Sequence, residues 1–183
     1  MGVVGWKGEH VRLVPLDEER HLENYVEWLN DPEVTEWLLV GDTPLTSLGE
    51  REFFRNLESR AASEIIFSIE TLDARHIGGS GLHGVSHKDR CATSGSFIGD
   101  KSAWGKGLGT DASRVRARYA FDVLGLDRLF SSHLAGNDRS MRMLQRCGYR
   151  ACGVLPKRYW KRGEFRDEHL YVLEREDWLR QGQ

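Results

Sequence analysis

Three glycines close together carry the clearest chemical signal in this sequence. They alternate with other residues in the segment Trp104-Gly105-Lys106-Gly107-Leu108-Gly109-Thr110. Glycine lets successive backbone amides point into one concavity, and the N-terminus of a following helix adds its dipole, so such a segment can bind a phosphate group. Neither common nucleotide-binding pattern fits, because the third glycine is one residue early for G-x-G-x-x-G and Gly107 follows Lys106 where a Walker A loop has Ser or Thr. A glycine-rich turn without a ligand is the alternative, since short glycine motifs often match by chance.

The elements that must position these glycines are predicted in the order strand, three helices, three strands, helix, strand, helix and two strands. Period-two patterns and short apolar runs predict seven strands, at residues 10–16, 64–71, 77–85, 91–98, 128–134, 149–160 and 165–173. Helical spacing predicts helices at residues 17–30, 33–39, about 47–60, 108–124 and 138–147. This order predicts a mixed sheet with helices on its faces.

Two of the predicted helices carry further signals. The helix at residues 47–60 begins with a capping box, Ser47-Leu48-Gly49-Glu50, and is expected to turn Phe53, Phe54 and Leu57 inward. The helix at residues 108–124 has one face formed by Ala112, Val115, Tyr119 and Val123. Its arginines are expected at the surface, as charged side chains usually are: Arg114, Arg116 and Arg118.

Length and composition limit the class of protein. The 183 residues correspond to one domain, residues 1–183, and 26 Lys and Arg against 28 Asp and Glu leave a net charge of −2, which offers no basic surface for nucleic acid. The sequence has no run of about 20 apolar residues that would predict a membrane span, and its N-terminus does not resemble a signal peptide. The three cysteines are scattered and predict neither a disulfide framework nor a metal site, so we expect a cytoplasmic protein without a metal.

The glycine segment resembles the pyrophosphate-binding loop of the GNAT acyltransferase superfamily, [QR]-x-x-G-x-[GA], with Trp104 where Gln or Arg is usual. Trp is familiar there in the branch that resembles the ribosomal-protein N-terminal acetyltransferases of the RimJ/RimL type. Other segments are similar to that branch in the same order along residues 12–178. They are Trp28-Leu29-Asn30-Asp31-Pro32-Glu33-Val34, Ile77-Gly78-Gly79-Ser80-Gly81-Leu82, Asn137-Asp138-Arg139-Ser140 with Gly148-Tyr149, and Gly163-Glu164-Phe165-Arg166-Asp167.

The resemblance implies a mixed, mostly antiparallel sheet of seven strands flanked by about four helices, in which two parallel strands splay apart. Those strands would be residues 91–98 and 128–134, with acyl-CoA between them. The pantetheine amides would bond to the strand backbone at Phe97, Ile98 and Gly99, as an added strand does. Trp104 would contact the cofactor, and the pyrophosphate would lie on the amides of Gly105, Lys106, Gly107, Leu108, Gly109 and Thr110. Lys106 has an equally good interpretation as a solvated loop lysine.

The resemblance also assigns groups at the reacting end. Asn137 would bond to the pantetheine arm, and Ser140, three residues later, would donate a hydrogen bond to the departing sulfur. Many members of the superfamily have a Tyr seven residues after this Asn, where the present sequence has Leu144. Helix capping is the alternative interpretation of Asn137 and Ser140, because Asn and Ser are favoured at helix N-termini for local reasons.

A general base is harder to assign. The branch often has a Glu in the strand before the glycine loop or just ahead of the last hairpin. The matching residues here are Thr93 and Tyr159, so neither position supplies a carboxylate as the base. His133, at the end of the strand that would face the thioester, is the candidate, and His83 is a second one; a structural histidine is the alternative for either. Deprotonating an amine of pKa ~10.4 at pH 7 costs about 4.6 kcal/mol, but an α-amine near ~7.8 costs only about 1.1 kcal/mol. A weak base is therefore better suited to a peptide N-terminus than to lysine or polyamines.

The leading hypothesis is an acetyl-CoA-dependent N-acetyltransferase in which an amine attacks the thioester directly in a ternary complex. Cys147 is expected to face the core, so it does not serve as an acyl carrier. The alternative is a GNAT-like module that binds CoA as a sensor or scaffold without transfer, and transfer of a longer acyl group is a third hypothesis. The acceptor could be a peptide N-terminus or a small amine. A homodimer is compatible with the sequence, which does not determine the oligomeric state.

Overall fold

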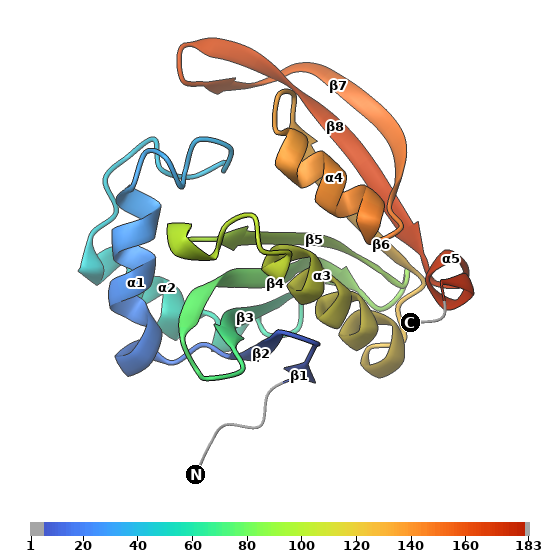
Figure 1. Ribbon diagram of the computed structural model, residues 1–183, viewed down its shortest axis with the longest axis horizontal. Helices are drawn as coiled ribbons and strands as arrows, with labels where there is room; N and C mark the ends of the chain where they lie inside the picture. Colours follow the sequence, from blue (N-terminus) through green and yellow to red (C-terminus); the bar gives the residue numbers. More distant parts are fainter. Residues whose placement is uncertain (1–5, 182–183) are drawn as a thin grey trace.

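A computed structural model describes residues 6–181 and contains one mixed sheet with helices on both faces (Figure 1). The strands lie in the order β1-β2-β3-β4-β5-β6-β8-β7. Their bounds are β1 Trp6–Lys7, β2 Val11–Pro15, β3 Glu64–Thr71, β4 His76–Ser86, β5 Cys91–Ile98, β6 Arg128–Leu134, β7 Arg150–Lys161 and β8 Glu164–Glu174. The α-helices are α1 Glu18–Asn30, α2 Ser47–Asn56, α3 Leu108–Arg118, α4 Asp138–Arg146 and α5 Arg175–Arg180. The predicted mixed, mostly antiparallel sheet is confirmed, with the two-residue strand β1 added to the seven predicted strands.

The only parallel pair of strands within residues 6–181, β5 with β6, separates soon after it begins. The strands are in register from Cys91↔Arg128 to Thr93↔Phe130. Beyond that point two serines bridge them, since Ser94 Oγ donates to the Phe130 carbonyl at 3.1 Å and Ser131 Oγ donates to the Ser94 carbonyl at 2.9 Å. β6 pairs with β8 along its whole length, and Figure 1 shows β7, β8 and α4 rising away from the strands β2 to β4. The sheet therefore opens between β5 and β6, as the resemblance implied.

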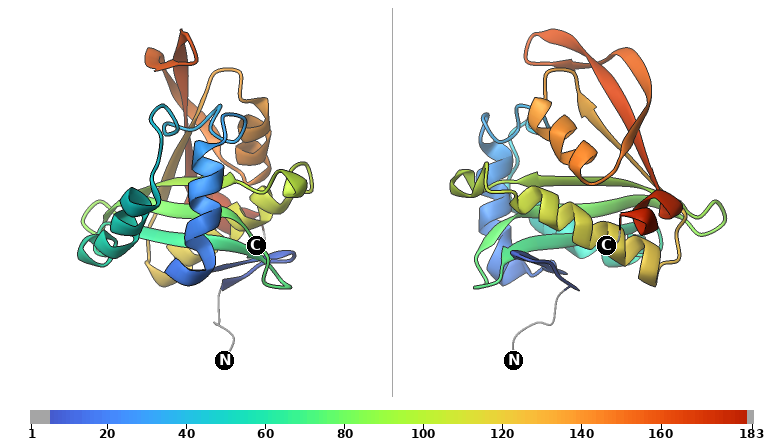
Figure 2. Two further views of the ribbon diagram at one scale, coloured as in Figure 1. Left: turned by 90° about the vertical axis from the view of Figure 1, so that its left-hand side faces the viewer. Right: turned by 45° about the vertical axis from the view of Figure 1, so that its right-hand side comes forward.

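The two faces of the sheet are covered by different helices (Figure 2). On one face Ala112 and Val115 of α3 pack against Leu13, Phe67 and Ile69 of β2 and β3. A second buried cluster on that face joins α3, α4 and α5 to β4, β5, β6 and β8. The other face belongs to α1 and α2, where the ring of Tyr25 packs against Phe54 and Phe97.

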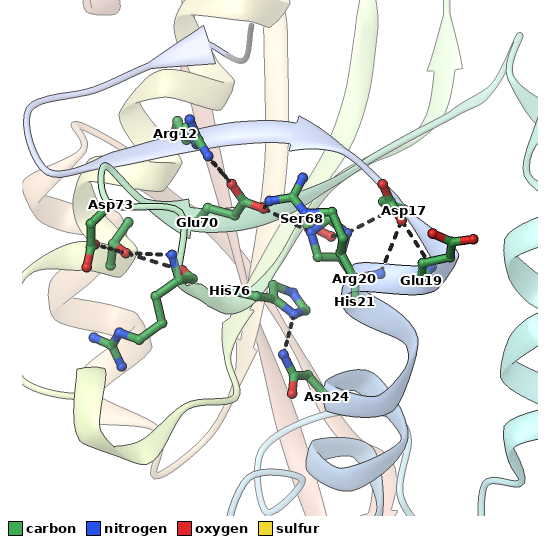
Figure 3. A network of polar contacts seen from close by, with 12 residues as sticks. Arg12, Asp17, Glu19, Arg20, His21, Asn24, Ser68, Glu70, Asp73 and His76 are labelled. Carbon is green, nitrogen blue, oxygen red and sulfur yellow. Dashed lines mark hydrogen bonds and ion pairs between the residues drawn. The ribbon is translucent and has the colours of Figure 1, made fainter. Parts of the chain in front are cut away.

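A buried polar network holds α1 against β3 (Figure 3). Glu70 of β3 accepts hydrogen bonds from Arg12 Nε at 2.9 Å and from His21 Nε2 at 3.0 Å, and it also pairs with Arg20. Asp17 caps α1 by accepting from the amides of Glu19 and Arg20. Burial would raise the pKa of Glu70, but the hydrogen bonds and the two arginine charges lower it, so the carboxylate stays charged. The network fixes the helix that carries one wall of the site described below.

His76 of β4 belongs to the same cluster as a neutral ring. Asn24 Nδ2 donates to its Nδ1 at 3.1 Å, and its Nε2–H donates to the Gly78 carbonyl at 3.0 Å. Burial lowers the pKa of His76 to about 4, and repulsion from a charged His21 lowers it as well.

The structure corrects three expectations about helices. Residues 33–39 form turns, because the amide and hydroxyl of Thr35 both bond to the Asp31 carbonyl and close one turn, too short to propagate. The cap of α2 is Thr46, whose hydroxyl accepts from the Gly49 amide at 3.1 Å, so the predicted capping box is one residue out of place. Finally, α3 ends at Arg118 and is followed by a π-helical turn, Tyr119–Val123.

That π-turn and the burial of Arg116 correct the predicted face of residues 108–124. The π-turn shifts the helical register, so Val123 is exposed. Arg116 is 0% exposed and not on the surface, because it follows buried Ala112 and precedes buried Ala120 by four residues each. The described residues contain no helix long and apolar enough to cross a membrane.

Candidate functional site

A cavity of about 910 Å³ lies where β5 and β6 separate. One part of its wall comes from Ser131 and His133 of β6 and from Asn137 and Ser140 at the start of α4. The opposite part comes from α1, α2 and residues 37–45, and Phe97 of β5 lies along the cavity. Four residues predicted to act together, Phe97, His133, Asn137 and Ser140, therefore line one space, whereas the glycine loop lies outside that lining.

The glycine loop begins α3 with unpartnered amides. Gly105 and Gly107 have φ angles of +73° and +79°, which favour glycine, and Gly107 is the N-cap of α3. Within residues 6–181, no hydrogen-bond acceptor meets the five successive amides from Gly105 to Gly109. The sixth amide of the predicted set, that of Thr110, donates to the Gly107 carbonyl at 3.0 Å. Because a β-carbon on Gly105 or Gly107 would have no heavy atom within 4 Å, the space before these amides is open. The five amides fit a pyrophosphate.

Trp104 joins the glycine loop to its surroundings. Its indole Nε1–H donates to the Ile98 carbonyl at the end of β5 at 2.7 Å. The guanidinium of Arg139, in the first turn of α4, lies over the Trp104 ring at 4.6 Å from the ring centre. Trp104 thus connects the loop to β5 and to α4, while Lys106 is exposed.

The end of β5 presents one residue to the gap between the parallel strands. The Gly99 amide donates to the Ile77 carbonyl at 2.9 Å and so belongs to the pairing of β5 with β4. In an antiparallel pair the backbone groups alternate in direction. Phe97, opposite Gly79, therefore directs its backbone groups toward β4, and Ile98 directs its own toward the gap. Of the three predicted positions, only Ile98 has an amide that is free for an added strand, because the Ile98 carbonyl already accepts from Trp104 Nε1–H.

Asn137 and Ser140 occupy the N-terminus of α4. Asn137 caps the helix, since its Oδ1 accepts from the Ser140 amide at 3.1 Å. Asn137 is therefore a helix cap, as the alternative interpretation predicts, and this role uses its side-chain oxygen. Its Nδ2 has no partner among the described residues. The Ser140 hydroxyl likewise has no partner in the described chain, and the half-buried residue lines the cavity.

His133 lies in a buried stack at the edge of the cavity. Its Nδ1–H donates to the Leu134 carbonyl at 2.9 Å, and its Nε2 is 3.3 Å from the Tyr171 hydroxyl. Its ring centre is 5.1 Å from that of His169 on β8. His83, the second candidate base, also lines the cavity, but its Nδ1 lies 2.6 Å from Glu64 Oε2. Both histidines thus have partners within the chain.

Sequence reasoning missed three carboxylates that line the cavity, Asp42, Glu50 and Glu168. Glu168 of β8 accepts from Ser132 Oγ at 2.6 Å and lies 3.9 Å from the Arg158 guanidinium. Glu50, in the first turn of α2, is 5% exposed, and burial raises its pKa. Helical spacing could have identified Glu50, because it precedes half-buried Phe54 by four residues on the face predicted to point inward. The prediction for Phe53 is wrong, because that side chain is exposed.

A buried cation reaches the cavity from the other face of the sheet. Arg116 Nη1 donates to Ser80 Oγ at 2.9 Å and to the Gly95 carbonyl at 2.7 Å, while Nη2 donates to Ser113 Oγ at 3.1 Å. Its Nε is buried without a partner in the described residues. No group of three or more His, Cys, Asp or Glu side chains within residues 6–181 is arranged to hold a metal ion.

Comparisons with known proteins give a consistent family. Residues 10–150 match the family described as acetyltransferase (GNAT) domain. YdaF of Bacillus subtilis strain 168, which carries a provisional name as a ribosomal N-acetyltransferase, is 27% identical over 175 residues, covering 93% of this chain and 94% of YdaF.

Solved structures share the fold. The spermidine N-acetyltransferase of Vibrio cholerae, in complex with CoA and spermine, has a TM-score of 0.83 at 20% identity over 92% of this chain and 98% of that one. RimJ of Mycobacterium smegmatis, in complex with CoA-disulfide, has a TM-score of 0.83 at 20% identity, covering 91% of this chain and 83% of RimJ.

Proposed function

The chain belongs to the GNAT acetyltransferase family and is an acetyl-CoA-dependent acetyltransferase, and we propose that it acetylates a primary amine by direct attack on the thioester. The observation that carries this proposal is the cavity at the separation of β5 and β6. The cavity has polar groups of α4 on one side and the walls of α1 and α2 on the other, so a thioester and an amine can enter from different directions.

The chain's polar groups fit acetyl-CoA at both ends. When bound, acetyl-CoA supplies the acetyl group as a reactive thioester. The five free amides from Gly105 to Gly109 would hold its pyrophosphate, with the helix dipole of α3 adding to the attraction. The Ile98 amide and Asn137 Nδ2 would hold the amides of the pantetheine arm, which would pass through the gap between β5 and β6.

Ser140 is the proposed donor to the departing sulfur. In the transfer an N–C bond forms, the C–S bond breaks and the amine loses a proton, so negative charge develops on the sulfur. The Ser140 hydroxyl faces the cavity and has no other partner in the described chain, so it is free to donate to that charge. The position occupied by Leu144 is buried and apolar and cannot do so.

His133 is the proposed acceptor of the amine proton. Its Nδ1–H donates to the Leu134 carbonyl, so Nε2 is the nitrogen that can accept a proton. The amine would replace the Tyr171 hydroxyl as the partner of Nε2. Because the Tyr171 hydroxyl already contacts Nε2, His133 is a weak base, and a weak base suits an amine that loses its proton easily. An α-amine costs about 1.1 kcal/mol to deprotonate at pH 7, and a peptide N-terminus or a small amine of low pKa is the acceptor class proposed.

Acceptor-dependent release of free CoA thiol tests the proposal. Acetyl-CoA is mixed with the protein and with a panel of peptides and small primary amines, and the thiol is measured with a chromogenic disulfide. Thiol release that requires both an amine and the protein is the expected result. Binding of acetyl-CoA without release for any amine in the panel would replace the proposal by a CoA-binding module.

A further inference from the structure

Glu50 is a buried carboxylate that faces the cavity without a partner. It is 5% exposed and lines the cavity from the first turn of α2. No hydrogen bond or ion pair reaches its oxygens from the side chains and backbone that the structure describes. The other acidic side chains in the lining differ, because Asp42 pairs with Lys161 Nζ at 2.9 Å and Glu168 accepts from Ser132 Oγ.

The fold does not need this charge. In the predicted capping box the Glu50 carboxylate would help to cap α2. Thr46 caps the helix instead, one residue earlier, so Glu50 has no capping role. Tyr25, Phe53 and Ile66 also line the cavity, so an apolar side chain would suit its wall. Burying a carboxylate without a partner costs free energy, and the raised pKa of Glu50 has this physical cause. A cation that entered the cavity would remove the cost.

The amine that reacts is not the natural partner of Glu50. Glu50 projects from α2, whereas Asn137 and Ser140, which face the reacting sulfur in the proposed function, belong to α4 on the other wall. A carboxylate next to the reacting nitrogen would also stabilise its protonated, unreactive form. A second positive charge on the acceptor can lie beside α2, away from the reacting sulfur, and it can stay protonated while the other amine reacts.

We propose that Glu50 binds a positive charge of the acceptor other than the amine that is acetylated, so that the enzyme selects primary amines that carry a second cationic group. This inference rests on the proposed function. Arg116, which reaches the cavity from α3, is held by Ser80 and Gly95 and leaves Glu50 without a counter-ion. The ligand class is a primary amine of low pKa with a second cationic group, such as a peptide with a basic side chain near its N-terminus. Diamines serve as simple probes of this class, because one ammonium group lowers the pKa of a nearby second amine.

Matched amines test the charge selection. The probes are α,ω-diaminoalkanes of three to eight carbons and n-alkylamines of the same lengths, assayed with acetyl-CoA by thiol release. A diamine has two reactive amines and therefore a twofold statistical advantage over the alkylamine of the same length. Beyond this factor, the wild type is expected to have a kcat/KM at least tenfold higher for one or more diamines than for the matching alkylamines. In Glu50→Gln this preference is lost because the KM for the diamine rises, while the KM for acetyl-CoA stays unchanged.

Two controls separate charge binding from structure. Glu52→Gln removes an exposed carboxylate from the same helix and should keep the preference. Glu50→Gln should melt at the wild-type temperature or above, because it removes a buried charge. Equal use of both amine series by the wild type, or an unchanged preference in Glu50→Gln, would overturn the inference.

A binding measurement keeps this inference separate from the proposed function. Calorimetry with CoA and the preferred diamine reads the contact with Glu50 even where no acetyl group is transferred. Tenfold weaker diamine binding to Glu50→Gln supports the inference, and equal binding to both proteins contradicts it. Absence of thiol release with every amine contradicts the proposed function instead.

Discussion

Replacing Gly107 by Val, beside a matched replacement of Gly125, tests whether the glycine loop binds the pyrophosphate. The two glycines have φ angles of +79° and +64°, and a β-carbon on either would meet no heavy atom within 4 Å. Both substitutions therefore carry the same kind of backbone cost, of at least about 1–2 kcal/mol, and no steric clash. For a chain of this size that cost lowers the melting temperature by about 2–8 °C in both variants.

Only the Gly107 variant should lose affinity for CoA. Its side chain would occupy the open space before the five free amides, whereas Gly125 lies beyond the π-turn, where its carbonyl accepts from Arg90. A hydrogen bond to a charged group contributes about 1.5–3 kcal/mol. Loss of one such bond raises the Kd for CoA by about 10-fold to 150-fold.

Calorimetric titration with CoA, together with thermal melting, measures both effects. Equal falls in melting temperature with a raised Kd in Gly107→Val alone are expected. A folded Gly107→Val protein with the wild-type Kd would refute the assignment of this loop. Equal losses of affinity in the two variants would attribute the effect to general destabilisation.

Ser140→Ala should lower kcat by about 100-fold with nearly constant Kd for acetyl-CoA, and unchanged kcat in a stopped-flow or steady-state assay would exclude the hydroxyl as the donor to sulfur. His133→Ala should raise the pH needed for half-maximal rate, and a pH–rate profile identical to that of the wild type would return His133 to a structural role. Stability should fall on acidification, because between pH 6.5 and about 4 the unfolded chain binds a proton that neutral His76 does not. The loss is up to about 3 kcal/mol in urea denaturation, and His76→Gln should flatten this pH dependence; equal slopes for both proteins would show that other groups cause it.

Local signals account for most of the correct predictions. Strand bounds at residues 64–71, 91–98 and 128–134 follow from alternation and short apolar runs, which are properties of neighbouring residues. Gly148 ends α4 at φ +84°, and Arg162 and Gly163, which lie between the last two predicted strands, form a turn with positive φ. The failures at residues 33–39 and at the cap of α2 also concern local choices. One closed turn at Thr35 is too short to propagate, and Thr46 caps α2 in place of neighbouring Ser47.

The sequence by itself determined the order of the strands β2 to β8 and of the helices α1 to α4, the open backbone of the glycine loop and the family resemblance. These depend on residue type and short spacing, which act before any distant contact forms. Only the tertiary structure decided which charged side chains enter the site. Glu50 and Arg116 have the same residue types as many surface positions, and their burial depends on strands and helices that come from elsewhere in the chain. The parting of β5 from β6 after Thr93 and Phe130 likewise depends on β8, because β6 follows its antiparallel partner when the parallel pairing ends.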